Sequence, residues 1–140
     1  MRLVDIDHIG IAVADLAEAV DHYRRTLGLT PCHSETIEIQ GVREVLFEAG
    51  TSFIQLLEPL GPDTPVGRFI EKKGPGLHHV GYRVDDVAKA LADLKGEGVT
   101  LIGEVPQIGS MGNTIAFVHP KDFGGVLAEL VEQRDPKPGA

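Results

Sequence analysis

Hydrophobic and polar residues alternate with a period of two over residues 8–13, a pattern typical of a β-strand. One face of this strand carries bulky apolar side chains, those of Ile9, Ile11 and Val13. The opposite face starts with His8 and continues with two small residues, Gly10 and Ala12. A histidine followed by small residues leaves open space beside the imidazole, so we expect this face to form the wall of a cavity.

Residues 79–90 repeat the pattern of residues 8–19. Six of the twelve aligned positions are identical, and His79 takes the place of His8. The bulky apolar face is present again, formed by Val80, Tyr82 and Val84. An internal repeat indicates a duplicated structural unit, and it has to be recognised before a fold is assigned.

A helix is predicted after each of these two strands. Asp15 is placed to cap the first helix, with Glu18 at the capping-box position, and Gly28 marks its C-terminal end. In the second copy, Asp85 or Asp86 precedes a similar helical pattern. Each copy therefore predicts a strand followed by a helix.

Three more strand-like runs follow each helix. They are TIEIQGV, VREVLFEAG and SFIQLLEP in the first half, and VTLIGEV, NTIAFVHP and GVLAELVEQ in the second. The sequence therefore predicts an α+β fold with two tandem βαβββ modules. Because neither half can bury its sheet alone, we expect the modules to form one curved mixed β-sheet around a shared cleft, with the helices outside.

The chain has the length of one ordinary domain. We expect a single domain over residues 1–134, made of module one at about 4–60, a connector at 61–76 and module two at about 77–134. The connector is rich in Pro and Gly, and it predicts one short helix that begins at Thr64 and Pro65. Residues 135–140 are expected to form a disordered tail.

Composition excludes several classes of protein. The formal net charge of −8 disfavours a nucleic acid partner. No apolar run approaches the roughly 20 residues that a membrane span needs, and no signal-peptide pattern is present, so we expect a cytoplasmic protein without a membrane partner. Cys32 is the only cysteine, which excludes an internal disulfide and a thiolate-rich metal site.

Two polar residues stand inside otherwise apolar strands of the two halves. Gln55 lies 47 residues after His8. Glu129 lies 50 residues after His79, so the repeat places Gln55 and Glu129 at corresponding positions. A buried amide or carboxylate needs a partner, and two imidazoles with two oxygen donors suit cobalt, nickel, manganese, iron or zinc. We therefore expect a metal-binding cleft that remains open to substrate.

The other four histidines are interpreted as structural or solvent-exposed groups. His78 alternates onto the face opposite His79, and His22 lies on the first helix. His33 falls in an expected loop, and His119 precedes a proline in a turn. None of these four is expected to bind the metal.

The sequence resembles the vicinal oxygen chelate superfamily, which includes glyoxalases, extradiol dioxygenases and resistance proteins. The resemblance rests on the repeated βαβββ halves with HIGIAV and HHVGYRVDD. More narrowly, an ordered set of stretches is similar to the methylmalonyl-CoA epimerase family: IDHIGIAVADL, QGVREVLF, IQLLEPLGPDTPVGRFIEKKGPGLHHVGYRVDDV, GSMGN and HPKDFGGVLAELV. This similarity covers nearly the whole chain except its C-terminal tail.

The resemblance implies a divalent metal ion, with cobalt as the leading candidate and manganese, nickel or zinc as alternatives. Its ligands would be His8, Gln55, His79 and Glu129. The resemblance also implies an isomerase that epimerises (2R)- and (2S)-methylmalonyl-CoA by proton transfer at the carbon alpha to the thioester, through a metal-stabilised enolate. The partners implied are a small acyl-CoA substrate and a second copy of the chain in a homodimer.

Epimerisation by two bases needs an acid/base group on each side of the reacting carbon. The resemblance assigns these roles to Glu44 and Glu129, and Glu129 would also be a metal ligand. From the residues alone, Glu38, Glu44 and Glu48 are equally well placed in the first module. The alternating pattern permits any of the three to face the cleft.

Four alternatives remain open at this stage. A glyoxalase-type lactoylglutathione lyase would use a similar metal, although Gln55 and Glu44 suit it less well. An extradiol dioxygenase of the same superfamily would need a redox-active iron held by two histidines and one carboxylate, which Gln55 as a fourth donor fits poorly. A non-catalytic protein that sequesters an antibiotic would need aromatic stacking surfaces, whereas the chain has no Trp, two Tyr and five Phe. A purely structural metal would be needed for folding and would support no reaction.

Overall fold

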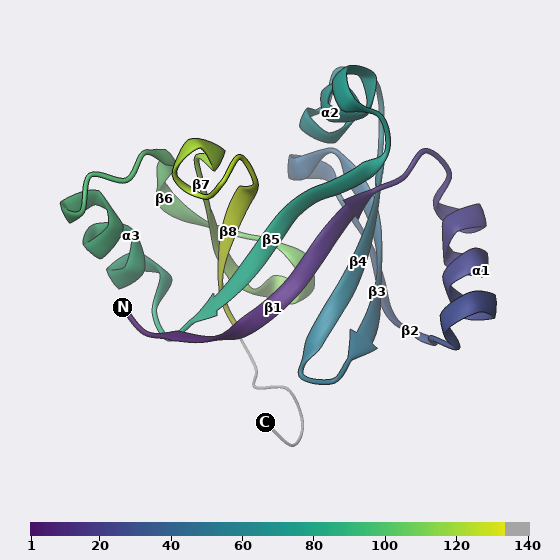
Figure 1. Ribbon diagram of the computed structural model, residues 1–140, viewed down its shortest axis with the longest axis horizontal. Coiled ribbons are helices and arrows are strands. Elements are labelled where there is room, and N and C mark those ends of the chain that lie inside the picture. Colours follow the sequence, from purple (N-terminus) through teal and green to yellow (C-terminus); the bar gives the residue numbers. More distant parts are fainter. Residues whose placement is uncertain (134–140) are drawn as a thin grey trace. The chain divides into compact units, whose positions relative to one another are not determined.

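The structure of the protein is a computed structural model that describes residues 1–133 (Figure 1). These residues form two compact units. The terminal unit consists of Met1–His8 together with the described residues from His79 onward. The central unit consists of Ile9–His78. Strand β1 (Leu3–Ala12) contributes its first part to the terminal unit and its last part to the central unit. The expected tail at 135–140 lies outside the described residues.

The central unit orders its strands β2-β3-β4-β1. Its elements are the end of β1, α1 (Leu16–Leu27), β2 (Pro31–Ile37), β3 (Val42–Ala49), β4 (Ser52–Pro59), α2 (Pro65–Lys73) and the start of β5 (Gly76–Val84). Strand β3 pairs in antiparallel fashion with both β2 and β4. Helix α1 lies beside this sheet (Figure 1) and packs on β3 and β4.

Local chemistry explains why α1 begins and ends where it does. The side chain of Asp15 accepts a hydrogen bond from the backbone N–H of Glu18 at 3.0 Å. At the other end, Gly28 takes a left-handed conformation with φ of 67°, and its N–H donates to the carbonyl of Arg24. Both ends agree with the sequence-based prediction.

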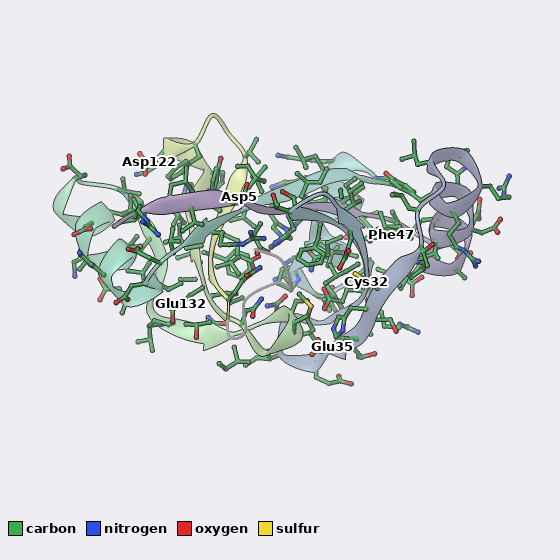
Figure 2. All side chains as sticks on the ribbon, turned by 90° about the horizontal axis from the view of Figure 1, so that it is seen from below. Asp5, Cys32, Glu35, Phe47, Asp122 and Glu132 are labelled. Carbon is green, nitrogen blue, oxygen red and sulfur yellow. The ribbon has the colours of Figure 1, made fainter. Side chains whose placement is uncertain are left out.

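The two faces of the central sheet have different environments. Phe47, which is fully buried, lies on the side of the sheet toward α1 (Figure 2) and stacks on Tyr23 with 6.0 Å between ring centroids. Val45 and Leu56 share this apolar core. Because side chains alternate along a strand, Glu44 points to the opposite face.

The terminal unit orders its strands β1-β5-β8-β7-β6. Its remaining elements are α3 (Val87–Gly96), β6 (Leu101–Ile108), β7 (Thr114–Val118) and β8 (Leu127–Glu132). Strand β5 runs parallel to β8, whereas β7 is antiparallel to both β8 and β6, so the sheet is mixed. Helix α3 packs on β6, β7 and β8, and buried aliphatic residues such as Leu91 and Leu130 form the core between them.

The internal repeat is visible in the hydrogen bonds of the two modules. Glu58, in the last strand of the first module, accepts from the N–H of Leu16 at 2.8 Å. Glu132, in the last strand of the second module, accepts from the N–H of Val87 at 2.9 Å. Each glutamate therefore satisfies the N-terminus of its own module's helix. Asp86, rather than Asp85, caps the second helix.

The connector forms the short helix that the sequence predicts. Thr64 caps α2 by accepting from the N–H of Gly67 at 3.0 Å, and Pro65 occupies the first turn.

No helix of the described residues is long and apolar enough to span a membrane.

One sequence-based boundary is wrong. The run TIEIQGV was expected to be a strand, and His33 was expected in a loop, but β2 begins at Pro31 and ends at Ile37. Residues Glu38–Gln40 form a 3₁₀ turn. Gly41 ends this turn with a left-handed φ of 69°, and a Cβ at this position would lie 2.6 Å from Thr64 Cγ2, so only glycine fits there. His33 is consequently a strand residue.

Candidate active site and metal centre

Three polar side chains converge inside the terminal unit, each from a different strand. They are His8 of β1, His79 of β5 and Glu129 of β8, and each is at most 5% exposed. The Nε2 atom of His8 lies 2.9 Å from Nε2 of His79 and 2.8 Å from Oε1 of Glu129. Nε2 of His79 lies 3.6 Å from the same oxygen. The sequence-predicted residues of this unit are thus brought together.

A glycine makes room for this cluster. Gly81 pairs with Glu129 across β5 and β8, and it follows His79 on the same face. A Cβ at Gly81 would overlap the imidazole ring of His8. Gly81 therefore leaves space on the face that carries His79, as the sequence predicts, and the ring of His8 occupies this space.

Two residues that the alternating pattern does not reveal hold His8 in place. Asp7 Oδ2 lies 2.7 Å from Nδ1 of His8, and Arg83 donates from Nε to Oδ1 of Asp7 at 3.0 Å. Both Asp7 and Arg83 are buried. A regular alternation would place Asp7 on the face opposite His8, so the pattern hid it. One signal in the sequence could have pointed to Asp7. Arg83 shares a face of β5 with His79, and a buried arginine needs a carboxylate partner.

The site favours positive charge. Burial opposes a charged imidazole, but the carboxylates of Glu129 and Asp7 outweigh it and raise the pKa of His8 to about 10. The pKa of Asp7 is lowered because its contacts with His8 and Arg83 outweigh its burial. A buried cluster with two carboxylates therefore attracts either a proton or a cation.

The donor set fits a divalent ion. The ligand atoms of His8, His79 and Glu129 all lie within 4.8 Å of one another. When Nδ1 of His8 donates to Asp7, its Nε2 lone pair is free to bind a metal, which is the arrangement that metal-ligating histidines commonly have. Two nitrogens and one carboxylate oxygen, without sulfur, suit a borderline or hard ion and leave coordination sites for other donors.

Gln55 and Glu44 lie in the central unit, on the face of the sheet opposite α1. Gln55 donates from Nε2 to Oε1 of Glu44 at 2.6 Å. Gln55 Oε1 is buried and has no hydrogen-bond partner within the part of the chain that the structure describes. A buried amide oxygen without a donor is costly, so this atom suits a ligand or a cation. Its role as fourth metal ligand stays a prediction.

The three glutamates that the sequence pattern offers equally as the second acid/base group differ in their burial. Glu44 is 1% exposed, whereas Glu38 and Glu48 are exposed to solvent. Glu44 therefore has the environment of a functional carboxylate. His33 Nε2 lies 3.9 Å from Oε2 of Glu44 and 2.9 Å from Oε1 of Glu35, so these three residues of β2 and β3 form a second polar cluster.

Three further histidines do not join the cluster of His8, His79 and Glu129 within the part of the chain that the structure describes. His78 packs edge-on against Phe69, with 5.0 Å between ring centroids, and burial lowers its pKa to about 4. His22 is exposed on α1, and His119 accepts from the N–H of Lys121. None of these three belongs to a group of candidate metal ligands among the described residues.

Known proteins share both the sequence and the fold. The model of the Glyoxalase/Bleomycin resistance protein/Dioxygenase superfamily matches residues 7–117. The chain is 38% identical, over 92% of its length, to the mitochondrial methylmalonyl-CoA epimerase of Mus musculus, of which it covers 73%. It is 39% identical, over 89% of its length, to an ethylmalonyl-CoA/methylmalonyl-CoA epimerase of Cereibacter sphaeroides, of which it covers 95%.

A solved structure gives the same result for the fold. A methylmalonyl-CoA epimerase in complex with methylmalonyl-CoA and NH4+ matches with a TM-score of 0.94 and 43% identity, over 97% of this chain and 99% of that one. The α+β fold class expected from the repeated βαβββ pattern is therefore confirmed.

Proposed function

We propose, from the premise that this chain belongs to the glyoxalase/bleomycin resistance protein/dioxygenase superfamily and within it to the methylmalonyl-CoA epimerase family, that it interconverts (2R)- and (2S)-methylmalonyl-CoA. Membership of this family makes the chain an epimerase, an enzyme of the isomerase class. The observation that carries the choice of substrate and mechanism is that the chain buries Glu44, a carboxylate additional to the one in its metal cluster.

Epimerisation removes one proton from the carbon alpha to the thioester and returns one to the opposite face. We assign these two transfers to Glu44 and Glu129. Both histidine contacts of Glu129 use its Oε1 atom, so Oε2 is the oxygen that can exchange a proton with substrate. For Glu44, the amide of Gln55 holds Oε1 and thereby orients the carboxylate. These contacts support the assignment of one base to each unit.

The proposed ligands of the ion are His8, His79 and Glu129, with Gln55 as the fourth. A bound divalent ion supplies a Lewis acid for the negative charge that develops on the thioester oxygen. Cobalt stays the proposed ion, with manganese, nickel or zinc as alternatives, because the donors are nitrogen and oxygen. Asp7 and Arg83 hold the ring of His8 for this task.

Three further expectations stay predictions: an acyl-CoA thioester as the small-molecule partner without a nucleic acid or membrane partner, a homodimer and a cytoplasmic location. The glyoxalase-type reaction on a glutathione adduct is the alternative activity within the same superfamily. A buried Glu44 held by Gln55 favours the two-base epimerase, because a carboxylate is then present outside the metal cluster.

The deciding experiment measures deuterium uptake at C2 of one methylmalonyl-CoA epimer in D₂O, together with the epimer composition. Metal-loaded protein and the same protein after chelation are compared. We expect exchange with inversion only in the metal-loaded sample. Absence of exchange in samples loaded with cobalt, manganese, nickel or zinc would reject the epimerase, and turnover of lactoylglutathione would then support the glyoxalase reaction.

A further inference from the structure

The buried base Glu44 has a histidine and a second glutamate next to it that the proposed reaction does not use. The side chain of Glu44 is 0% exposed, whereas those of His33 and Glu35 are 29% and 35% exposed. Strands β2 and β3 pair Glu35 with Glu44, so the three side chains share one face of the central sheet. His33 and Glu35 therefore lie between the buried carboxylate and solvent.

A two-base reaction creates a need for such a connection. When Glu44 takes a proton from one face and Glu129 gives one to the other, the turnover ends with Glu44 protonated and Glu129 deprotonated. The reverse reaction ends with the opposite distribution. Before the next turnover in the same direction, each carboxylate must exchange its proton with solvent. A side chain that is 0% exposed cannot do this directly, so Glu44 needs a relay.

The position of His33 matches this requirement. Its Nε2 lies 2.9 Å from Oε1 of Glu35, which holds the ring, and 3.9 Å from Oε2 of Glu44. The distance of 3.9 Å is longer than a hydrogen bond, but a small rotation of the ring or one bridging water closes it. Imidazole is also the side chain that accepts and releases protons most readily near neutral pH.

We propose that His33, held by Glu35, carries protons between Glu44 and solvent and so resets this base between turnovers. The proposal rests on the epimerase function proposed above. Neutral His33, protonated at Nδ1, turns its Nε2 from Glu35 toward Glu44 and accepts the proton there, and the resulting imidazolium turns back and donates this N–H to the carboxylate of Glu35. The imidazolium then releases one proton to water, so the proton taken from substrate ends in solvent. In the reverse direction each transfer is reversed.

In this proposal His33 acts only through Glu44, so its effect is specific to reset. We expect His33→Gln to keep a fast first turnover and to slow later ones, which gives a burst of epimerised product followed by a steady state about tenfold slower. The burst should appear in both directions, because both directions leave Glu44 in the wrong protonation state. Metal affinity should stay unchanged.

Small buffers provide the second readout. Adding imidazole should restore steady-state turnover in His33→Gln, because a soluble base can replace the missing relay, and should leave the wild type unaffected. His22→Gln is the matched control, since it removes an exposed histidine of α1 in the same unit. Glu35→Gln keeps the imidazole of His33 but weakens the contact that holds the ring. We expect a smaller burst in this variant and recovery of steady-state turnover when imidazole is added. If His33→Gln does not fold, Glu35→Gln carries the test.

The outcomes separate the relay from the epimerase itself. An inactive wild type with bound metal rejects the epimerase function. An active wild type whose His33→Gln and Glu35→Gln variants turn over normally, without burst or buffer dependence, rejects the relay alone. Loss of a second bound ion in His33→Gln also rejects the relay, because His33, Glu35 and Glu44 would then be a cation site.

Discussion

At the scale of single residues, the cluster depends on positions that carry no reacting group. Gly81 leaves the space that the ring of His8 occupies, and Asp7 holds the other side of that ring. Arg83 in turn holds Asp7. The orientation of this candidate metal ligand is therefore set by its neighbours, as is general for metal sites in proteins.

Gly81→Ala is expected to weaken metal binding by about tenfold or more, because displacing a ring from a filled site costs about 1–3 kcal/mol. Isothermal titration with Co²⁺ measures the effect, and circular dichroism checks the fold. Gly96→Ala is the control, since this glycine of α3 has nothing within 4 Å of a Cβ. Equal affinities of the two variants would show that the ring of His8 has room to move.

Glu44→Gln is expected to bind metal normally and to lose about 10²- to 10⁴-fold in kcat, because the amide cannot take a proton. Steady-state epimerisation and metal titration measure the two properties. Glu48→Gln, an exposed glutamate on the same strand, should be indistinguishable from the wild type. Normal turnover of Glu44→Gln would remove this residue from the mechanism.

At the scale of elements, each module secures its helix in the same two ways. An aspartate caps each helix from its own loop, Asp15 for α1 and Asp86 for α3. A glutamate from the last strand of the module accepts a hydrogen bond from a backbone N–H at the same helix end. This residue is Glu58 for α1 and Glu132 for α3. These glutamates lie three residues after Gln55 and Glu129, so the helix ends fix which positions of the two strands are equivalent.

Asp15→Ala is expected to lower the free energy of unfolding by about 1 kcal/mol, because the N–H of Glu18 loses its acceptor. Asp86→Ala should have a similar effect through Lys89. Urea titration followed by circular dichroism compares both with Asp63→Ala, a control outside the helices. A loss below about 0.3 kcal/mol in both would mean that Glu58 and Glu132 suffice as caps.

At the scale of the whole molecule, the duplication explains why the chain repeats its histidine. One module supplies one imidazole and one oxygen donor at equivalent positions, which is too few for a catalytic ion. In the described structure, His8 of the first module already joins His79 and Glu129 of the second within one compact unit. The site therefore depends on both copies of the repeat.

Removing the metal is expected to abolish epimerisation while the protein stays folded, because a protonated His8 can pair directly with Glu129 in place of the ion and keep its contact with Asp7. The unfolding temperature should fall and should recover with added Co²⁺, by the linkage of binding to stability. Calorimetry with and without a chelator, together with activity, measures this. Complete unfolding on chelation would instead support a purely structural metal.

Much of this arrangement could be predicted from the sequence by itself. The period of two, the repeated histidine and the capping residues determine strands, helices and modules, because these signals depend on neighbours along the chain. They also place His8 and His79 at equivalent positions of the two repeats. The strand boundary at Pro31 and the place of His33 escaped this reading, because β2 is defined by its pairing with β3, which residues close in the chain do not reveal.

Only the tertiary structure decided which polar residues meet. Burial selected Glu44 over Glu38 and Glu48, and pairing of β2 with β3 brought Glu35 and His33 beside it. The contact of Asp7 with Arg83 likewise joins residues far apart in the chain. The physical reason is that alternation tells which face a side chain takes, whereas strand order and register determine which side chains that face brings together.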